Sequence, residues 1–425
     1  MIDNPTNWAG NYTYRAAGLH YPETIEQVQA LVSRTSKLRA LGSRHSFNHI
    51  ADSPGDLISL DRLEPVFALD RERNTVTVDA GARYGQFCEQ LHREGYALRN
   101  MASLPHISVA GACATATHGS GDRNGNLATA VAAMELVTAD GTVVVLSRNQ
   151  EGERGSQFAG AVVGLGGLGV VTRLTLDVVP AFDMRQDVYE GLPFAQLEAH
   201  FDEITSSAYS VSLLLDWRDE RVNQVWLKRP VTDGATFELP AEFYGAAPAP
   251  THRHPIPGFS AEPCTEQMGI RGAWYARLPH FKMGFTPSSG EELQAEYLLP
   301  RRHAIAAFRA IYGLREHVAP LLQISEVRTV AADDLWLSPC YGQDCVAVHF
   351  TWEKNWEAVS RVMALVEEQL APLDARPHWG KLFTTSPARV QSLYPKLPDF
   401  QRLLRSYDPQ GKFRNAFLDA YIFGE

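Results

Sequence analysis

The sequence reads LGSRHSFN at residues 41–48 and ISVAGACATATHGSG at residues 107–121, two glycine-rich segments that carry most of the structural information. The first leaves a predicted strand through a glycine and places Ser43, Ser46 and Asn48 beside successive backbone N–H groups, which is typical of an anion-binding nest. In the second, small side chains let backbone amides approach a pyrophosphate. Either segment alone is equally consistent with a tight core loop, but two in one chain favour a long cofactor with two anionic groups.

Regular elements are predicted around both segments. Apolar residues at helical spacing predict helices at 25–32 and 84–91. MELVTADGTVVVLS at 134–147 predicts a hairpin with Asp140-Gly141 at its turn. The predicted strands of this first unit are LRALG (38–42), LISLDRL (57–63), TVTVDAG (75–81) and VVTRLTLDVVP (170–180).

A second unit is predicted after Pro180. The segment 230–263, rich in Ala, Pro and Gly, predicts a long surface excursion, and 292–322 is interpreted as mostly helical. The predicted fold is α+β, with two unequal units and the second inserted before a returning tail. The predicted strands of the second unit are SAYSVSLLLDW (207–217), NQVWLKR (223–229), QISEVRTV (323–330) and CVAVHFTW (345–352).

Composition narrows the class of protein. The 425 residues include 39 Lys and Arg against 49 Asp and Glu, a net charge of −10, which argues against nucleic acid and anionic membranes as partners. The chain has no secretion-type start and no apolar run of membrane-spanning length, so we expect a soluble, cytoplasmic protein. Its five cysteines are scattered without C-x-x-C spacing, which indicates neither a disulfide framework nor a zinc site.

A third glycine segment, GLGGLG at 164–169, matches the dinucleotide pattern G-x-G-x-x-G. That pattern binds a nicotinamide cofactor only where it follows a strand and opens a helix. Here the glycines run directly into a β-branched strand. We therefore interpret the match as a chance occurrence.

Histidine pairs offer little support for a metal site. His45 and His49 have helical i, i+4 spacing, but they follow a glycine turn and no third ligand lies near them in sequence. His252 and His254 lie in the Pro-rich excursion and are interpreted as solvated. No metal is predicted.

Two predicted strands carry polar pairs among apolar residues. Glu326 and Arg328 share one face of QISEVRTV, and His349 and Thr351 share one face of CVAVHFTW, because side chains alternate along a strand. These faces either meet solvent or form a polar wall that binds several hydroxyl groups and supplies a base. The pattern alone favours neither. Lys381, between aromatic residues in HWGKLF, is a further candidate.

Short segments along nearly the whole chain are characteristic of one protein family. They are NWAGN, LGSRHSFN, NMASLPHISVAGACATATHGSG, MELVTADG, GGLGVVT, CTEQ, FTPSSG, SEVRTVAAD, WLSPCYG, HFTW, RPHWGK and DPQGKF. With these segments the chain resembles flavoprotein oxidases of the vanillyl-alcohol oxidase type, and among them the alditol (xylitol) oxidases. The resemblance implies a PCMH-type FAD-binding domain of residues 1–180, completed by about 376–425. A cap domain of residues 181–375 with an antiparallel sheet would cover the flavin.

The resemblance also implies how FAD is held. His45 would bond covalently to the flavin 8α-methyl carbon, Val171 would meet the pyrimidine edge through its backbone, and His378 would lie close to the flavin. Arg44 departs from the glycine that relatives often have, which puts the local loop geometry in question. The implied cofactor-binding residues are Leu41, Gly42, Ser43, Arg44, His45, Ser46, Phe47, Ser103, Ser108, Gly111, Thr115, Ala116, Thr117, His118, Val171 and His378.

The activity implied by the resemblance is oxidation of the terminal hydroxyl of a polyol, such as xylitol or sorbitol, to the aldose. Hydride would pass to flavin N5, O2 would be reduced to H2O2, and the enzyme would act as a monomer. The alternatives are a sugar-lactone (aldonolactone) oxidase or dehydrogenase of the same superfamily and, from another class, an NAD-linked or non-catalytic carbohydrate-binding protein. The implied catalytic and substrate-binding residues are Ser103, Glu326, Arg328, His349 as the base, Thr351 and Lys381.

Overall fold

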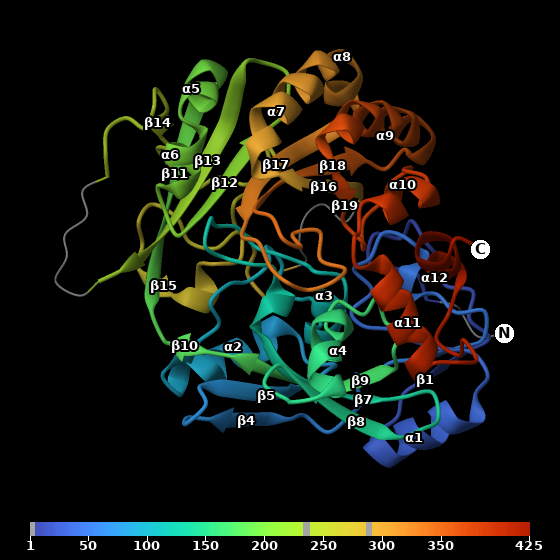
Figure 1. Cartoon of the computed structure of the whole chain (residues 1–425). Coiled ribbons are helices and arrows are strands. Elements are labelled where there is room, and N and C mark those ends of the chain that lie inside the picture. Colours follow the sequence, from blue (N-terminus) through green and yellow to red (C-terminus); the bar gives the residue numbers. More distant parts are fainter. Residues whose placement is uncertain (1–4, 233–238, 286–290) are drawn as a thin grey trace.

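The first part of the chain forms two main sheets with short helices around them (Figure 1). Its elements are β1 (Gly18–His20), α1 (Ile25–Arg34), β2 (Leu38–Ala40), η1 (His49–Ala51), β3 (Asp56–Ile58), β4 (Phe67–Asp70), β5 (Thr75–Asp79), α2 (Tyr84–Arg93), β6 (Tyr96–Ala97), α3 (Val109–Ala114), η2 (Leu127–Ala130), β7 (Val131–Val137), β8 (Val143–Ser147), α4 (Glu153–Ala161), β9 (Val170–Asp177) and β10 (Val179–Pro180). A parallel sheet has the order β1-β3-β2, and an antiparallel sheet of five strands has the order β4-β5-β9-β7-β8. The computed structural model describes residues 5–232, 239–285 and 291–425, so the FTPSSG segment (285–290) lies almost wholly outside them.

Several elements of this part are confirmed as predicted. α2 buries all four apolar residues whose spacing predicted it. β7 and β8 form the expected hairpin, in which Val137 pairs with Val143 and Gly141 at the turn adopts a φ of +85°, a conformation that favours glycine. The GLGGLG glycines lead into the strand β9, which agrees with their interpretation as something other than a dinucleotide fingerprint.

The second part of the chain builds one large antiparallel sheet of nine strands. Its elements are β11 (Asp183–Pro193), α5 (Phe194–Ala199), α6 (Phe201–Ser206), β12 (Ser210–Leu215), β13 (Arg221–Val231), β14 (Ala247–Pro248), β15 (Gly272–Ala273), η3 (Trp274–Ala276), β16 (Glu292–Pro300), η4 (Arg301–His303), α7 (Ala304–Gly313), α8 (Arg315–Val318), η5 (Ala319–Leu321), β17 (Leu322–Val330), β18 (Cys345–Glu353), α9 (Trp356–Leu370), η6 (Ala371–Leu373) and β19 (Arg376–Pro377). The strand order is β14-β11-β13-β12-β17-β18-β16-β19, and β15 pairs with β11. Among the described helices, none is both long and apolar enough to cross a membrane.

Strand alternation separates the two faces of this sheet. Val211, Leu213 and Leu215 of β12 pack with apolar residues of α5, α6, α7 and α9 in one core, and these helices cover the outer face in Figure 1. The alternate residues of the same strands point to the opposite face. The sheet therefore presents that second face to the first part of the chain.

The prediction of helix at 292–300 is wrong, because Glu292–Pro300 forms the strand β16. Leu, Gln, Ala and Glu favour helices intrinsically, and this propensity misled the interpretation. All nine residues are buried between β18 and β19, so tertiary packing overrides the local preference. The helix predicted to follow is present as α7 and α8.

The chain after residue 377 returns to the first domain. Its helices are α10 (Pro387–Ser392), α11 (Leu397–Tyr407) and α12 (Ala416–Leu418), followed by the π-helix η7 (Asp419–Phe423). α11 contacts α4, α12 contacts η1, and their apolar residues join the core of the first part (Figure 1). The α+β two-domain architecture is confirmed, while the boundaries at residues 180/181 and 375/376 stay predictions.

Candidate active site

One cavity gathers nearly all the residues that the sequence singled out. It lies between the first domain and the polar face of the nine-stranded sheet. Ala116, which was also predicted to bind the cofactor, is buried and does not line it. The predicted residues that line the cavity are Leu41, Gly42, Ser43, Arg44, His45, Ser46, Phe47, Ser103, Ser108, Gly111, Thr115, Thr117, His118, Val171, Glu326, Arg328, His349, Thr351, His378 and Lys381.

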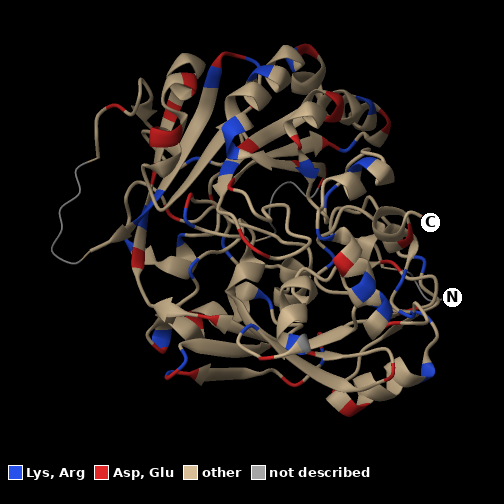
Figure 2. Ribbon diagram, viewed as in Figure 1, with Lys and Arg blue, Asp and Glu red and all other residues tan. Residues whose placement is uncertain are grey.

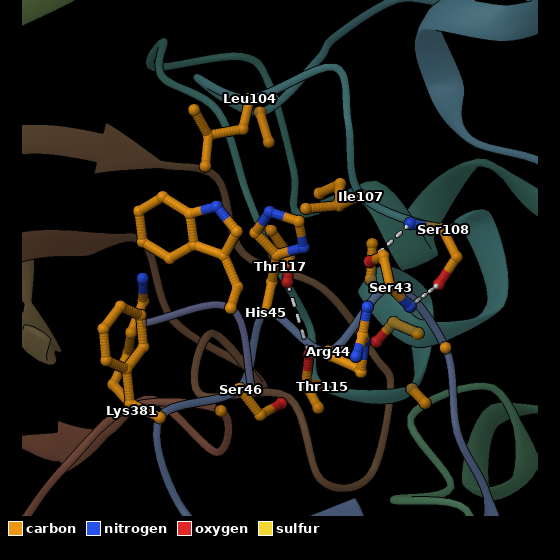
Figure 3. A pocket seen from close by; sticks show the side chains of 18 of the residues that line it. Ser43, Arg44, His45, Ser46, Leu104, Ile107, Ser108, Thr115, Thr117 and Lys381 are labelled. Atoms are coloured by element: carbon orange, nitrogen blue, oxygen red, sulfur yellow. Dashed lines mark hydrogen bonds between the residues drawn. The ribbon is translucent and has the colours of Figure 1, made fainter. Parts of the chain in front are cut away.

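The two glycine-rich segments lock together through Ser43 and Ser108. The Ser43 N–H donates to Ser108 Oγ at 3.3 Å, and the Ser108 N–H donates to Ser43 Oγ at 3.0 Å (Figure 3). Gly42 allows this approach, since a Cβ there would stand 2.5 Å from Ser108 Oγ. The pair fixes the first loop against the segment that opens α3.

The loop around His45 presents unused donors to the cavity. Arg44 has a φ of +62°, the left-handed conformation that glycine favours, so an arginine is held there at a cost of about 1 kcal/mol. Within the described chain, the backbone N–H groups of Arg44, His45 and Ser46 donate no hydrogen bond. Successive N–H groups without a protein acceptor are what an anion-binding nest requires, and the nest itself stays a prediction.

His45 itself is held by stacking. Its ring lies on Trp8, with centroids 5.5 Å apart and planes 15° from parallel. Both ring nitrogens are buried without a hydrogen-bond partner among the described residues. Burial lowers the pKa of His45 to about 3, so the ring is neutral at pH 7.

The floor of the cavity includes the glycines that resembled a nucleotide motif. Leu165, Gly166 and Gly169 line the cavity. The buried guanidinium of Arg39 donates to the carbonyls of Gly166 at 2.9 Å and Leu165 at 2.7 Å. Arg39 thereby fixes this loop below the cavity.

The polar wall is built by strand register. Glu326 of β17 pairs with His349 of β18, and His349 pairs in turn with Glu296 of β16. Residues directly opposite in an antiparallel pair share a face, so these three side chains form a row. The same-face prediction for Glu326/Arg328 and His349/Thr351 agrees with this arrangement.

Glu296 is the central residue that sequence reasoning missed. One carboxylate oxygen lies 2.9 Å from Arg328 Nη2 and 3.1 Å from His118 Nε2, and the other lies 3.6 Å from His349 Nδ1. It was overlooked because its strand was interpreted as a helix. The signal was present, since polar residues at 292, 294 and 296 alternate as on one face of a strand.

Lys381 reaches the same wall from the returning chain. Its Nζ donates to Gln294 Oε1 and lies 4.9 Å from the ring centroid of Phe47. Asn48 Nδ2 donates to the Lys381 carbonyl at 2.7 Å. The His45 loop and the HWGK segment are therefore one connected structure, although more than 300 residues separate them in sequence.

Charges in the wall are mutually compensated. Burial raises the pKa of Glu326, but Arg328 and His280 more than offset it and hold that pKa far below its ordinary value. The pKa of Glu296 is likewise well below its ordinary value, because His118 and Arg328 outweigh its burial. Burial lowers the pKa of His349 below 6.5 and that of Lys381 to about 8. At pH 7 the wall thus holds two carboxylates, two cations and a neutral imidazole.

His254 corrects the interpretation of the Pro-rich excursion as a surface segment, and His280 adds a cavity residue that was not predicted. His254, which was expected to be solvated, is buried and lines the cavity together with Ile256. His280 also lines it, donates through Nε2 to Glu326 Oε1 at 2.8 Å, and had no sequence signal. His252 is partly exposed. No group of His, Cys, Asp and Glu in the described ranges could hold a metal ion.

Comparisons with known proteins add to this geometry. A family described as an FAD binding domain matches residues 16–147, and one described as D-arabinono-1,4-lactone oxidase matches residues 290–421. The chain is 51% identical to an alditol oxidase of a Streptomyces species over 99% of both chains. It is 27% identical to the L-gulono-1,4-lactone dehydrogenase of Mycobacterium tuberculosis over 97% of both. The fold matches cholesterol oxidase from B. sterolicum with a TM-score of 0.78 and 14% identity, over 99% of this chain and 96% of that one.

The fold and site define an FAD-dependent oxidoreductase of the vanillyl-alcohol oxidase type. The cavity fits that cofactor. Within the described residues it offers the unused N–H groups of the His45 loop, the close approach at Gly42 and the His45 ring nitrogens, which have no hydrogen-bond partner. Within this class, the chain belongs to the alditol oxidase family.

Proposed function

We propose that this enzyme oxidises the terminal hydroxyl of an alditol to the aldose, with O2 as electron acceptor and H2O2 as product. The observation that carries the proposal is the polar wall of Glu296, Glu326, Arg328, His349 and Thr351 opposite a cofactor loop. A buried wall with this many polar groups matches a substrate with several hydroxyls. When bound, FAD accepts the hydride from the carbinol carbon and passes the electrons to O2.

His349 is proposed as the base that takes the hydroxyl proton. Its pKa is lowered by burial, so the ring is unprotonated and ready to accept at pH 7. Nδ1 faces the Glu296 carboxylate at 3.6 Å, which favours a proton on Nδ1 and a lone pair on Nε2. Nε2 lies 3.2 Å from Thr351 Oγ1, and we propose that the substrate hydroxyl meets it there.

The cations Arg328 and Lys381 are proposed to stabilise negative charge that develops as the hydroxyl loses its proton. Arg328 is buried beside Glu296, Lys381 is partly buried beside Gln294, and both line the cavity. Charge stabilisation is strongest where water is excluded. Because the pKa of Lys381 is lowered to about 8, its contribution should decline above that pH.

Hydroxyl recognition is proposed for three further groups. Ser103, whose Oγ lies 3.4 Å from Arg328 Nη1, would bind a hydroxyl near C2, and Glu326 and Thr351 would bind hydroxyls farther along the chain. A site of this kind penalises substrates that lack the hydroxyls, because its own buried polar groups are then left unpaired. This supports a preference for polyols.

Substrate profiling tests the proposal. Initial rates of H2O2 formation with xylitol, sorbitol and ethanol should give kcat/KM values that fall by about tenfold or more for each hydroxyl that is lost. L-gulono-1,4-lactone, assayed with O2 and with an artificial electron acceptor, represents the lactone alternative. Equal efficiency on ethanol, or a clear preference for the lactone, would contradict the polyol assignment.

Covalent attachment of FAD through His45 is the second part of the proposal. Acid precipitation should leave the yellow flavin in the protein pellet of the wild type and in the supernatant of His45→Ala, because the bond survives denaturation and the non-covalent contacts do not. His49→Ala is the matched control and should keep the flavin in the pellet. Free flavin from the wild type would contradict the bond to His45. A colourless protein that binds NAD would overturn the whole assignment, while the monomeric state and cytoplasmic location stay predictions.

A further inference from the structure

A row of buried residues beside the cavity wall, on the same face of the sheet, supports Glu326. Lys228 lies on β13, two strands away from Glu326 across β12, and its side chain is only 1% exposed although it does not line the cavity. His280 lies between the two residues. A lysine that has no part in the proposed reaction therefore lies next to the polar wall.

The donor and the acceptor of each hydrogen bond between Lys228, His280 and Glu326 can be assigned. Glu326 is ionised and can only accept, so His280 donates to it through Nε2 at 2.8 Å. Burial lowers the pKa of His280 to about 4, which leaves the neutral ring no proton for Nδ1. His280 Nδ1 must then accept from Lys228 Nζ, which lies 3.2 Å away.

Hydrogen bonds hold the Lys228 side chain in one orientation. Its Nζ also donates to the carbonyl of Leu278 at 2.5 Å and to that of Pro279 at 3.0 Å, so the protonated amine has one acceptor for each of its three protons. Burial lowers the pKa of Lys228 to about 7, so this form predominates below that pH. The His280 ring is packed on Trp226 with centroids 4.8 Å apart. Lysine, imidazole and carboxylate therefore form a rigid chain that ends at the cavity.

The end of this chain is bound to one carboxylate oxygen only. Glu326 Oε1 accepts from His280 and lies 3.5 Å from Arg328 Nε. Among the described residues no hydrogen bond to Glu326 Oε2 occurs, so that oxygen is available to a ligand in the cavity that Glu326 lines. A carboxylate fixed at one oxygen presents the other in a defined direction.

We propose that Lys228 and His280 are positioning residues that fix the Glu326 carboxylate for the distal hydroxyls of a polyol and thereby set the preference for longer polyols. This inference rests on the proposed polyol oxidase function. It assigns to a lysine outside the cavity a role in substrate selection. A purely structural lysine would affect stability and leave substrate selection unchanged.

Lys228→Met tests the role, because methionine fills similar space without donating. We expect KM for xylitol to rise about tenfold, the loss of one well-placed charged hydrogen bond, with kcat unchanged. KM for 1,2-propanediol, which lacks the distal hydroxyls, should stay the same. Calorimetric titration of the photoreduced holoenzyme with xylitol should show the same weakening without turnover.

Two controls keep the test decisive. Lys412→Met removes another buried lysine, one that donates to the Val32 carbonyl and does not line the cavity, and should leave both KM values unchanged. His280→Gln retains an N–H for Glu326 and should keep more xylitol affinity than His280→Phe. If Lys228→Met does not fold, this His280 pair carries the test.

Other outcomes separate the inference from the proposed function. Unchanged xylitol KM in Lys228→Met, or equal increases for xylitol and 1,2-propanediol, would overturn the positioning role while leaving the oxidase assignment intact. A wild-type enzyme that oxidises no polyol would remove both together.

Discussion

Replacing His349 by alanine is expected to slow reduction of the bound flavin by xylitol by about 10² to 10⁴-fold, the usual contribution of a general base. His349 is the buried neutral imidazole whose Nε2 is oriented by Thr351 and whose Nδ1 faces Glu296. Of the other neutral imidazoles among the described cavity residues, His280 already donates to Glu326 through Nε2. Anaerobic stopped-flow absorbance measures the reduction rate directly, and the flavin content of the variant should equal that of the wild type.

The pH profile adds a second measurement on the same variant. A base acts in its unprotonated form, so the wild-type reduction rate should be constant near neutral pH and fall as the pH drops through the His349 pKa, which burial places below 6.5. This acid limb should be absent from His349→Ala. The exposed His317→Ala is the control and should behave as wild type. Reduction of His349→Ala at the wild-type rate would place the base elsewhere.

Arg328→Met is expected to damage both activity and stability. Arg328 is the cation closest to Glu296 and also lies 3.5 Å from Glu326, with all three side chains buried. Removing one partner from such a buried cluster costs about 3–5 kcal/mol in the free energy of unfolding. Loss of its positive charge should also lower kcat by about 10² to 10³-fold. Denaturant unfolding and steady-state assays measure the two effects.

The stability difference should depend on pH in a defined direction. In the wild type Glu296 and Glu326 have depressed pKa values, so their contribution to stability is present above the ordinary glutamate pKa and is lost as the pH falls through the folded-state values. Arg328→Met raises these folded-state values. The gap between wild type and variant should thus be largest near pH 7 and narrow toward acid pH.

Two substitutions calibrate this result. Arg328→Lys retains the charge but loses the planar fork of donors, and should recover part of the stability. Arg309→Met breaks an exposed ion pair with Glu198 and should leave the free energy of unfolding nearly unchanged, because solvent screens such pairs. An Arg328→Met enzyme as stable as Arg309→Met would show that the buried cluster contributes little.

The charged residues of the whole chain are distributed differently from those of the active site. Figure 2 shows acidic and basic residues interspersed along the ribbon of both domains. The net charge of −10 is the sum of these scattered charges. In the active site Arg328 and Lys381 are set against Glu296 and Glu326, so the wall is nearly balanced.

Errors of the sequence interpretation have a common origin. Glu296 was missed because a strand buried on both sides contains residues that favour helices, and local propensity cannot report burial. His254 was taken as solvated because its neighbours are prolines and glycines, whereas the loop folds back over the cavity. His280 and Lys228 carried no motif, since their roles come from contacts with residues that are distant in sequence.

The sequence by itself predicted the class of fold, the glycine-rich loop that we propose to hold the cofactor, and the same-face pairs Glu326/Arg328 and His349/Thr351. Glycine requirements and strand alternation are local properties, and one chain is enough to display them. Only the tertiary structure decided that β17, β18 and β16 stand side by side, which assembles Glu326, His349 and Glu296 into a row. Strand order and burial arise from packing between distant segments, so the partners and pKa values that define the site's chemistry depend on the whole fold.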